Sequence, residues 1–371
     1  MIAQTSTPPL LLPPMPFWGI ALFAGGLCLV LCRVFAGKAL LPDIPNGRSS
    51  HVAATSRAGG LAIIIAVCSG IVAISFMNTA GVLGETVLAG GEGDHLLDLL
   101  ALSLIAAGFG LVDDRFGLGP AVKALGQVLP AILFTLMIAQ FTSFPVPGLG
   151  AVDLGWFGYP VTVLWIVGFM NVYNFMDGAN GLAGACGAIL CLMIGLVSVP
   201  LGLDAVCAAG LITGFVLLGF LWVNLGEGRI FMGDGGSQSA AFMIAALGVM
   251  LCDREGGGVD VIPVLFVPMM ALILIADVAL TLLMRLQRGE NIFQAHRQHT
   301  YQRLLEIGCP HWVVALLYAS ATAVMASIAL LAFSWSPGQQ WLVIVATFSG
   351  FAALSLILKI KMHPVSANPG R

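Results

Sequence analysis

Long apolar runs dominate the chain, and each is close to the length that a helix needs to cross a lipid bilayer. A transmembrane helix takes about 20 consecutive apolar residues, because the hydrocarbon core is about 30 Å thick. Only 9% of the residues are charged, whereas a soluble domain carries about 25%. We therefore predict an all-α, polytopic bundle of transmembrane helices, with residues 1–371 forming one integral membrane domain. Eleven such runs occur, at residues 17–36, 59–77, 96–112, 121–140, 158–175, 181–199, 205–224, 236–252, 261–284, 312–334 and 340–358.

The basic residues between these runs are distributed unevenly. If the N-terminus lies outside and the runs alternate, 14 of the 15 Lys and Arg residues fall on the inner side and only Arg254 falls outside. Cytoplasmic loops of membrane proteins carry an excess of Lys and Arg. We therefore expect the N-terminus outside and the C-terminus in the cytoplasm. On the outer side, the connection at residues 141–157 has the Gly- and Pro-rich composition of a small hairpin.

Five polar clusters fall in connections that this topology places on the cytoplasmic side. Taken singly, each has a plain interpretation as a basic loop, an Asp-capped helix end, a tight turn or a solvated basic helix. Together they gather carboxylates, basic groups and an aromatic ring at one membrane face, which fits a magnesium-bound nucleoside diphosphate compound. The clusters are PNGRSSHVAATSRAGG (45–60), GLVDDRFGLGPAVKALGQ (110–127), NVYNFMDGANGLAG (171–184), VNLGEGRIFMGDGGSQSAAF (223–242) and MRLQRGENIFQAHRQHTYQRLLE (284–306).

The third cluster places polar side chains on one helix face. Asn171, Asn174 and Asp177 recur every three residues, a spacing that makes them neighbours on a helix. Polar groups at a membrane boundary are costly unless they form a site or face water. In the second cluster, Asp113 and Asp114 are adjacent, and the repulsion between their charges invites a metal ion, another cation or a raised pKa.

The remaining clusters supply groups that suit phosphate, metal and base. Asp234 lies in a Gly-rich turn, an arrangement that suits a Mg2+ ligand. Phe231 precedes it and can stack on a base. Arg57 lies just ahead of a predicted helix start, where an anion is favoured. Asp277 is different because it lies inside an apolar run, and we favour a structural role within the bundle for it.

In order and spacing, these clusters resemble those of the polyprenyl-phosphate N-acetylhexosamine-1-phosphate transferases. The resemblance covers about residues 40–305 and leaves out the last two runs, 312–358. It implies catalytic roles for Asp113, Asp114 and Asp177. It implies Mg2+ as the cofactor, with Mn2+ as an alternative ion, held by Asp234 and Asn174. It also implies substrate contacts from a larger set of residues: Arg57, Lys123, Asn174, Asn180, Asn224, Phe231, His296, Arg297 and His299.

Two departures from the family pattern bear on the substrate. Asn180 stands where the family often has the second Asp of Asp-Gly-x-Asp-Gly, so it can hydrogen-bond a base but carries no charge. His296 and His299 are separated, whereas the peptidoglycan-initiating enzyme has a run of three histidines. In this the chain is similar to the branch that starts O-antigen synthesis with N-acetylated deoxysugars.

The reaction that the resemblance implies joins a UDP-N-acetylated sugar to undecaprenyl phosphate in the bacterial cytoplasmic (inner) membrane. UMP leaves, and the lipid-diphosphate-sugar starts O-antigen or another cell-envelope polysaccharide. The lipid bilayer is the expected partner, a homodimer is admitted, and no nucleic acid is expected. A transporter or flippase of an anionic substrate is the alternative, because Asp277 and the interrupted polar spans fit a transport path. Against it, the polar clusters gather at one face.

Overall fold

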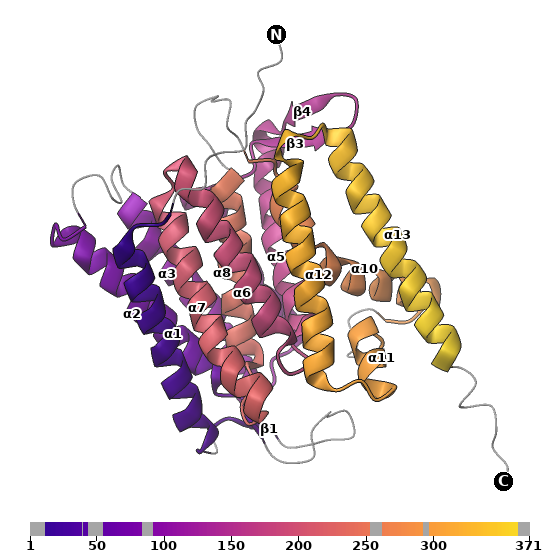
Figure 1. Cartoon of the computed structure of the whole chain (residues 1–371), viewed down its shortest axis with the longest axis horizontal. Helices are drawn as coiled ribbons and strands as arrows, with labels where there is room; N and C mark the ends of the chain where they lie inside the picture. The colour runs from indigo at the N-terminus through magenta and orange to yellow at the C-terminus, as the bar shows by residue number, and fades with distance from the viewer. Residues whose placement is uncertain are drawn as a thin grey trace.

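The chain forms a bundle of long helices that run side by side (Figure 1). In a computed structural model, residues 12–38, 40–43, 55–83, 92–252, 262–291 and 297–362 are described. Within these ranges, ten helices are long and apolar enough to cross a membrane, which confirms the all-α fold class. They are α1 (Met15–Ala36), α2 (Gly59–Thr79), α3 (Glu92–Phe116), α4 (Pro120–Met137), α5 (Gly158–Met176), α6 (Leu182–Ser198), α7 (Asp204–Glu227), α8 (Gly233–Cys252), α12 (His311–Leu331) and α13 (Pro337–Met362).

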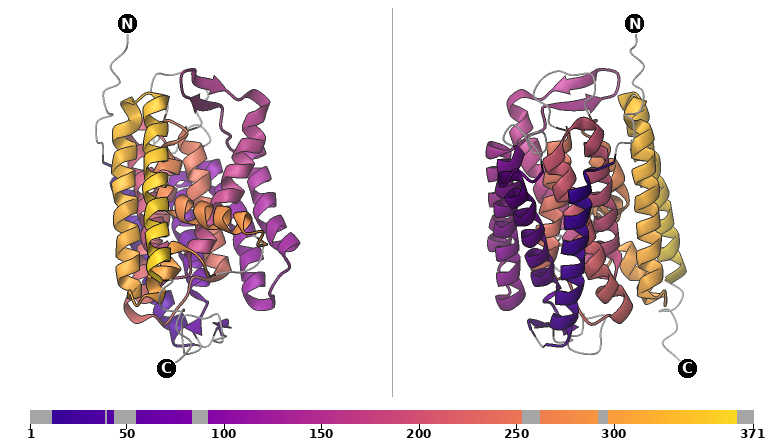
Figure 2. Two further views of the ribbon diagram at one scale, coloured as in Figure 1. Left: turned by 90° about the vertical axis from the view of Figure 1, so that its right-hand side faces the viewer. Right: turned by 60° about the vertical axis from the view of Figure 1, so that its left-hand side comes forward.

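The ninth predicted run, 261–284, is not one continuous helix. It forms the short α9 (Phe266–Met270) and the 16-residue α10 (Leu272–Gln287), with the break at Ala271, three residues after Pro268. Proline is a usual cause of helix kinks, because its ring removes a backbone donor and crowds the preceding turn. α10 then runs across the direction of its neighbours (Figure 1 and Figure 2, left). The prediction of eleven continuous spans is therefore wrong at this run.

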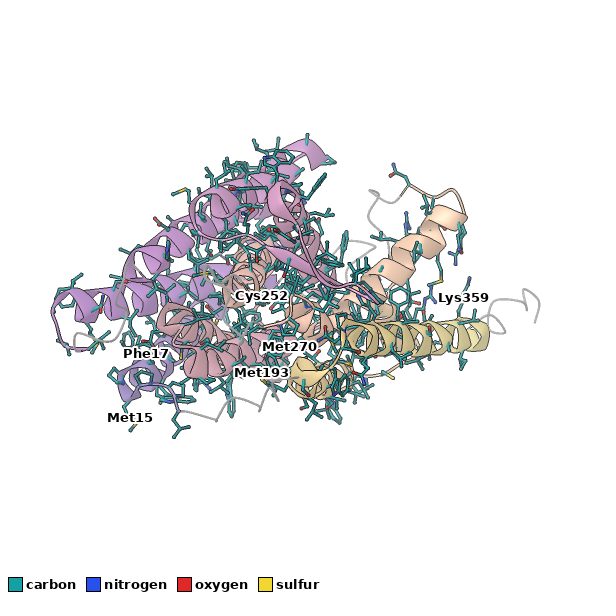
Figure 3. The ribbon with its side chains drawn as sticks, turned by 90° about the horizontal axis from the view of Figure 1, so that it is seen from above. Met15, Phe17, Met193, Cys252, Met270 and Lys359 are labelled. Atoms are coloured by element: carbon teal, nitrogen blue, oxygen red, sulfur yellow. The ribbon has the colours of Figure 1, made fainter. Side chains whose placement is uncertain are left out.

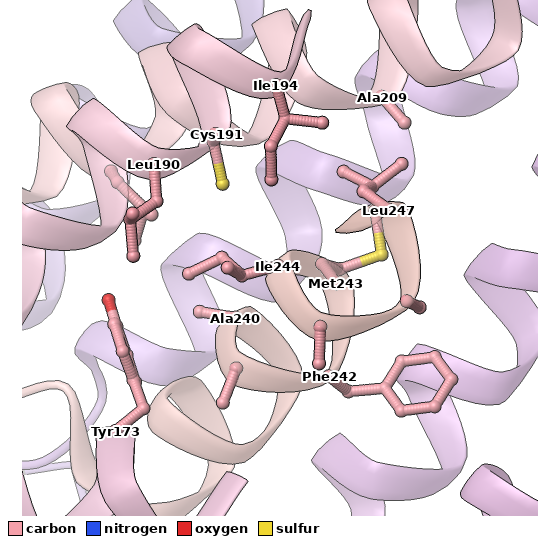
Figure 4. Close-up of a cluster of buried hydrophobic side chains, with 14 of the residues drawn as sticks. Tyr173, Leu190, Cys191, Ile194, Ala209, Ala240, Phe242, Met243, Ile244 and Leu247 are labelled. Carbon is pink, nitrogen blue, oxygen red and sulfur yellow. The ribbon is translucent and has the colours of Figure 1, made fainter. Parts of the chain in front are cut away.

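α8 is the central helix of the bundle. Nearly all of its side chains are buried. Seen from above, Cys252 at its end lies near the middle of the outline, whereas Met15 and Lys359 lie toward its edge (Figure 3). Figure 4 shows Cys191 and Ile194 of α6 facing Ile244 and Leu247 of α8. A helix that is apolar all round is stable only when other protein or lipid surrounds it, so α8 provides a rigid support for the residues at its two ends.

Glycines bring two helices directly against the first turn of α8. A Cβ added to Gly60 of α2 would overlap the backbone nitrogen of Gly236, and one added to Gly110 of α3 would overlap the carbonyl oxygen of Asp234. Only a residue without a side chain allows backbones to approach this closely. These contacts fix the N-terminus of α8, and with it Asp234, against the ends of α2 and α3.

The two ends of the bundle differ. At one end, which we call the hairpin end, β3 (Ser143–Val146) and β4 (Gly150–Asp153) form an antiparallel hairpin, as predicted for the 141–157 connection. At the other end, which we call the site end, β1 (Pro42–Asp43) pairs with β2 (Thr55–Ser56). α1 begins at the hairpin end and α13 ends at the site end (Figure 1). This arrangement agrees with termini on opposite faces, while the face each one occupies stays a prediction.

Three short 3-10 segments and one short helix complete the connections near the ends. η1 (Gly155–Phe157) leads into α5, and η2 (Val199–Leu201) joins α6 to α7. η3 (Ala332–Ser334) separates α12 from α13. The seven-residue α11 (Thr300–Glu306) follows α10 and precedes α12 in the chain. It lies at the site end of the bundle (Figure 1).

Candidate active site

Four helix ends meet at the site end: the C-termini of α3 and α5 and the N-termini of α4 and α8. Polar side chains from three of the predicted clusters contact one another there. Lys123 and Asn174 both lie within hydrogen-bond reach of Asp234, although these residues are up to 111 positions apart. These three clusters therefore meet at one end of the bundle, and the membrane face that this end occupies stays a prediction.

Lys123 joins the carboxylates of two different helices. Its ammonium forms an ion pair with Asp113 and lies 3.4 Å from Oδ2 of Asp234. Asp113 is buried and also accepts a 2.5 Å hydrogen bond from the backbone N–H of Leu118. The Lys123 side chain remains 46% exposed, so its charge is accessible to an anion that arrives from outside the bundle. The arrangement combines two carboxylates and an accessible cation.

Asp114 has a different environment from its neighbour. Its two oxygens accept hydrogen bonds from the backbone N–H groups of Asp234 (3.0 Å) and Gly235 (2.9 Å). Its side chain is only 2% exposed, and Arg57 lies 3.7 Å away. A carboxylate at this position satisfies the unpaired donors of a helix N-terminus and interacts favourably with the helix dipole. The structure thus indicates that Asp114 anchors α8, and its predicted catalytic role stays a prediction.

Gly233 allows this anchoring. Its φ of 66° lies in the left-handed region, and a Cβ on it would approach Oδ2 of Asp114 to 2.6 Å. Any other residue would be strained at this φ and would press on the Asp114 carboxylate. The glycine before Asp234 is therefore required by both backbone conformation and space.

Asn174 and Asp177 lie at the end of α5. The amide nitrogen of Asn174 donates to Oδ1 of Asp234 (3.0 Å) and to Oγ of Ser237 (2.8 Å). Asp177 follows the last turn and accepts no side-chain hydrogen bond from the described residues. Burial, together with the nearby charges of Asp234 and Asp114, raises the pKa of Asp177 well above its usual value, and Arg57 opposes this shift. A carboxylate in this environment is stabilised by an added cation.

A second layer of amides lies one helical turn below these residues. Gln127 of α4 donates to Asn171 of α5 (3.3 Å) and to Gln238 of α8 (3.2 Å), and Asn171 donates back to Gln127 (2.8 Å). Gln238 and Ser237 were missed by sequence reasoning. The signal was present for Gln238, because it follows Asp234 by four residues, the same spacing that joins Lys123 and Gln127.

The acidic groups suit a magnesium ion that is shared with a substrate. Among the described residues, no group of three or more His, Cys, Asp or Glu could hold a metal by itself. Mg2+ keeps several waters and commonly uses one or two carboxylates together with substrate phosphates. Asp234 and Asp177 provide two carboxylates whose mutual repulsion a divalent ion would relieve, so the residues fit this use. Asn174 turns its amide nitrogen to Asp234, and its role as a metal ligand stays a prediction.

Asn224 joins the connection between α5 and α6 to the connection between α7 and α8. Its oxygen accepts from the backbone N–H of Gly181 (2.6 Å) and its nitrogen donates to the carbonyl of Ile230 (2.8 Å). Both polar ends of the side chain therefore bind backbone, which indicates a structural role for Asn224. Its predicted contact with a substrate stays a prediction. The backbone N–H of Asn180 donates to Nδ1 of His311 (3.0 Å), a residue of α12 that sequence reasoning missed.

Phe231 lies on the other side of this junction and is half-buried. Its backbone N–H donates to the carbonyl of Ser56 (2.8 Å), and its carbonyl accepts from the N–H of Gly59 (3.0 Å). Two segments far apart in sequence, 55–60 and 228–234, are thereby joined next to Arg57. These bonds fix the backbone of Phe231, and its predicted contact with a base stays a prediction.

The histidine segment is placed only in part. His296 lies outside the described residues, and Arg297 is exposed. His299 is 2% exposed and lies between the rings of Phe175 and Tyr301, with centroid distances of 5.7 and 5.8 Å. The structure therefore gives His299 a packing role, and its predicted contact with the donor substrate stays a prediction.

Comparison with known proteins gives consistent matches. The sequence model of glycosyl transferase family 4 matches residues 96–252, which carry most of the site. The decaprenyl-phosphate N-acetylglucosaminephosphotransferase of Mycolicibacterium smegmatis is 31% identical over 375 residues, covering 94% of this chain and 88% of the relative. The Mycobacterium tuberculosis protein of the same name is 30% identical over 312 residues, covering 77% and 74%. The undecaprenyl-phosphate alpha-N-acetylglucosaminyl 1-phosphate transferase of Escherichia coli K12 is 25% identical over 350 residues, covering 90% and 88%.

Proposed function

Because this chain belongs to glycosyl transferase family 4, with the polyprenyl-phosphate N-acetylglucosaminephosphotransferases, we propose that it transfers an N-acetylhexosamine 1-phosphate from a UDP-sugar to undecaprenyl phosphate. The names of its relatives support the polyprenyl phosphate acceptor and the transferred group. The observation that carries the proposal is the position of Lys123 between Asp113 and Asp234. It places an accessible cation among carboxylates at the end of a membrane bundle, where a lipid phosphate can reach it.

In the net reaction, an oxygen of the acceptor phosphate becomes bonded to the β-phosphorus of the UDP-sugar. The bond from that phosphorus to the bridging oxygen breaks, and UMP leaves with the electron pair. One phosphoanhydride replaces another, so no further energy source is needed. A phosphate monoester has a second pKa of about 6, so the acceptor is largely ionised at neutral pH. Asp113 therefore holds Lys123 and positions the acceptor more than it removes a proton.

Both reactants are anionic, and the site must offset their repulsion. Lys123 is placed for the acceptor phosphate, and Arg57 and Arg297 are candidates for the donor diphosphate. When bound by Asp234 and Asp177, Mg2+ would neutralise charge on the diphosphate and hold it in line with the acceptor; Mn2+ is the alternative ion. Phe231 and Asn180 are candidates for the uracil. We place the reaction at the cytoplasmic face of the bacterial inner membrane, where nucleotide sugars are available.

The structure weakens the argument for a transporter. Its main argument was a carboxylate within an apolar run, yet Asp277 accepts hydrogen bonds from Tyr318 (2.6 Å) and from the backbone N–H of Thr300 (2.8 Å). A carboxylate engaged in this way is held by the fold and does not line a transport path.

The proposal is tested with purified protein, undecaprenyl phosphate and Mg2+, against a panel of UDP-sugars. The panel contains UDP-N-acetylglucosamine, which the relatives' names favour, and N-acetylated deoxysugars, which the separated histidines favour. We expect UMP release with at least one N-acetylated donor and none with UDP-glucose. Movement of an anionic substrate across vesicles without release of UMP would support the transporter instead.

A further inference from the structure

Asp277 of α10 is a fully buried carboxylate with an unusually complete set of partners. It accepts hydrogen bonds from the backbone N–H groups of Thr300 (2.8 Å) and Tyr301 (3.3 Å) and from the hydroxyl of Tyr318 (2.6 Å). Nδ1 of His299 lies 3.7 Å away. A buried carboxylate is costly unless hydrogen bonds or an opposite charge satisfy it, and here α11, α12 and the residue before α11 provide those groups.

These bonds determine where α11 begins. Thr300 and Tyr301 are its first two residues, and the first N–H groups of a helix have no partner within the helix. Asp277 supplies the acceptor for both, and Gln302 closes the turn by accepting from the backbone N–H of His299 (3.1 Å). The start of α11 is thus tied to α10 through one carboxylate.

Tyr301 extends this connection to the turn that carries Asp177. Its hydroxyl donates to the carbonyl of Phe175 (3.0 Å) and accepts from Nε2 of Gln302 (3.1 Å). The Phe175 carbonyl belongs to the last turn of α5, where carbonyls lack partners within the helix. A Cβ added to Gly178 would overlap the Tyr301 hydroxyl, so the tyrosine packs directly on the residue that follows Asp177.

We propose that Asp277 and Tyr301 are positioning residues for Asp177, which they hold through the Phe175 carbonyl and the backbone at Gly178. The inference rests on the proposed function, because it assumes that Asp177 acts in sugar-phosphate transfer. Asp277 fixes the start of α11, and α11 in turn positions the side chain of Tyr301. The tyrosine hydroxyl then fixes the position and orientation of the turn that carries Asp177. None of these groups needs to touch a substrate.

The direct test is Tyr301→Phe, which removes the hydroxyl and leaves the ring and the cap of α11 in place. A displacement of about 1 Å in a reacting group can cost about 100-fold in rate. We expect kcat for UMP release to fall by about tenfold or more, with KM for donor and acceptor changed by less than about threefold. Asp277→Asn should likewise lower kcat with little change in KM, and it should lower the melting temperature more than Tyr301→Phe does. Thr322→Val is the matched control, because it removes a buried hydroxyl on α12 that contacts Cys186 and not this network.

A second arm does not depend on activity. With the Asp177→Cys substitution, the alkylation rate of the introduced thiol reports how firmly the turn is held. Adding Tyr301→Phe should raise that rate severalfold, whereas adding Thr322→Val should not. If the wild type releases no UMP, the proposed function fails while this arm still tests the positioning. If the wild type is active but Tyr301→Phe changes neither kcat nor the alkylation rate, the positioning role is wrong.

Discussion

The backbone N–H of Asp234 donates a 3.0 Å hydrogen bond to the carboxylate of Asp114. The adjacent Asp113 instead forms an ion pair with Lys123. Consecutive residues on a helix point about 100° apart, so these two carboxylates face different neighbours. The two aspartates therefore have different roles. Asp114 fixes the N-terminus of α8, and Asp113 holds the half-exposed ammonium of Lys123.

Replacing each aspartate with alanine should separate these roles. Asp114→Ala removes the cap of α8 and should lower the free energy of unfolding by about 1 kcal/mol or more, with a lower melting temperature in detergent. Asp113→Ala should abolish most UMP release and lower the melting temperature less than Asp114→Ala does, because it breaks one backbone hydrogen bond and an ion pair with a half-exposed lysine. Equal loss of stability in the two variants would show that this assignment of roles is wrong.

Lys123→Met should remove the accessible positive charge while keeping the length of the side chain. We expect activity to fall by about 100-fold or more, as when one preorganised charged or hydrogen-bonding group is lost from an active site. The loss should include a higher KM for undecaprenyl phosphate. Lys359→Met, near the end of α13, is the control and should retain activity. An unchanged acceptor KM in Lys123→Met would contradict the proposed acceptor site.

Asp234→Asn should raise the magnesium requirement. Hard cations prefer charged oxygen ligands, and loss of one carboxylate should increase the half-saturating Mg2+ concentration by about tenfold or more. Titration of activity with Mg2+ measures this shift, and Asp98→Asn, toward the other end of α3, is the control. Normal activity with an unchanged magnesium dependence would refute Asp234 as a ligand.

Arg297 and His299 should respond differently to substitution. Arg297 is exposed, so Arg297→Lys should leave stability unchanged and lower turnover, because lysine keeps the charge but loses the planar fork that binds phosphate. His299→Ala opens a gap between Phe175 and Tyr301 and should lower the melting temperature as well as the rate. Chelators should unfold neither variant. If Arg297→Lys keeps the wild-type affinity for the donor and the wild-type rate, Arg297 does not contact the donor.

The termini should be accessible from opposite sides of the membrane. α1 begins at the hairpin end and α13 ends at the site end (Figure 1), and the distribution of basic residues predicts that the site end faces the cytoplasm. Ser6→Cys should therefore react with a membrane-impermeant thiol reagent in intact cells, and Ser366→Cys should react only after permeabilisation. Equal labelling of both from outside would overturn the topology.

Much of the bundle could be predicted because hydrophobic length is a local property. Ten predicted runs coincide with helices to within several residues, and α8 begins near its Gly-rich turn as expected. Hydropathy alone did not predict the kink at Ala271, because it measures length and not direction; the signal in the run 261–284 was Pro268. The oblique path of α10 depends on contacts with α5, α12 and α13 that only the folded chain provides.

The composition of the site was also visible in the sequence, but the partner of each residue was not. Asp113 and Asp114 were one motif in the sequence, and their different neighbours depend on how α3 lies against α8. Asn224 was expected at a substrate, yet both ends of its amide bind backbone. The contact between Tyr301 and Phe175 joins residues 126 positions apart, and no local pattern indicates it.

We propose that this protein cleaves a UDP-sugar between its two phosphates and leaves the sugar phosphate on a lipid. The most direct measurement is the stoichiometry of nucleotide and lipid products from purified protein, a UDP-N-acetylated sugar and undecaprenyl phosphate. We expect one UMP for each lipid-diphosphate-sugar formed, with no reaction when the lipid phosphate is omitted. Release of UDP, or consumption of the donor without a lipid-diphosphate product, would contradict it.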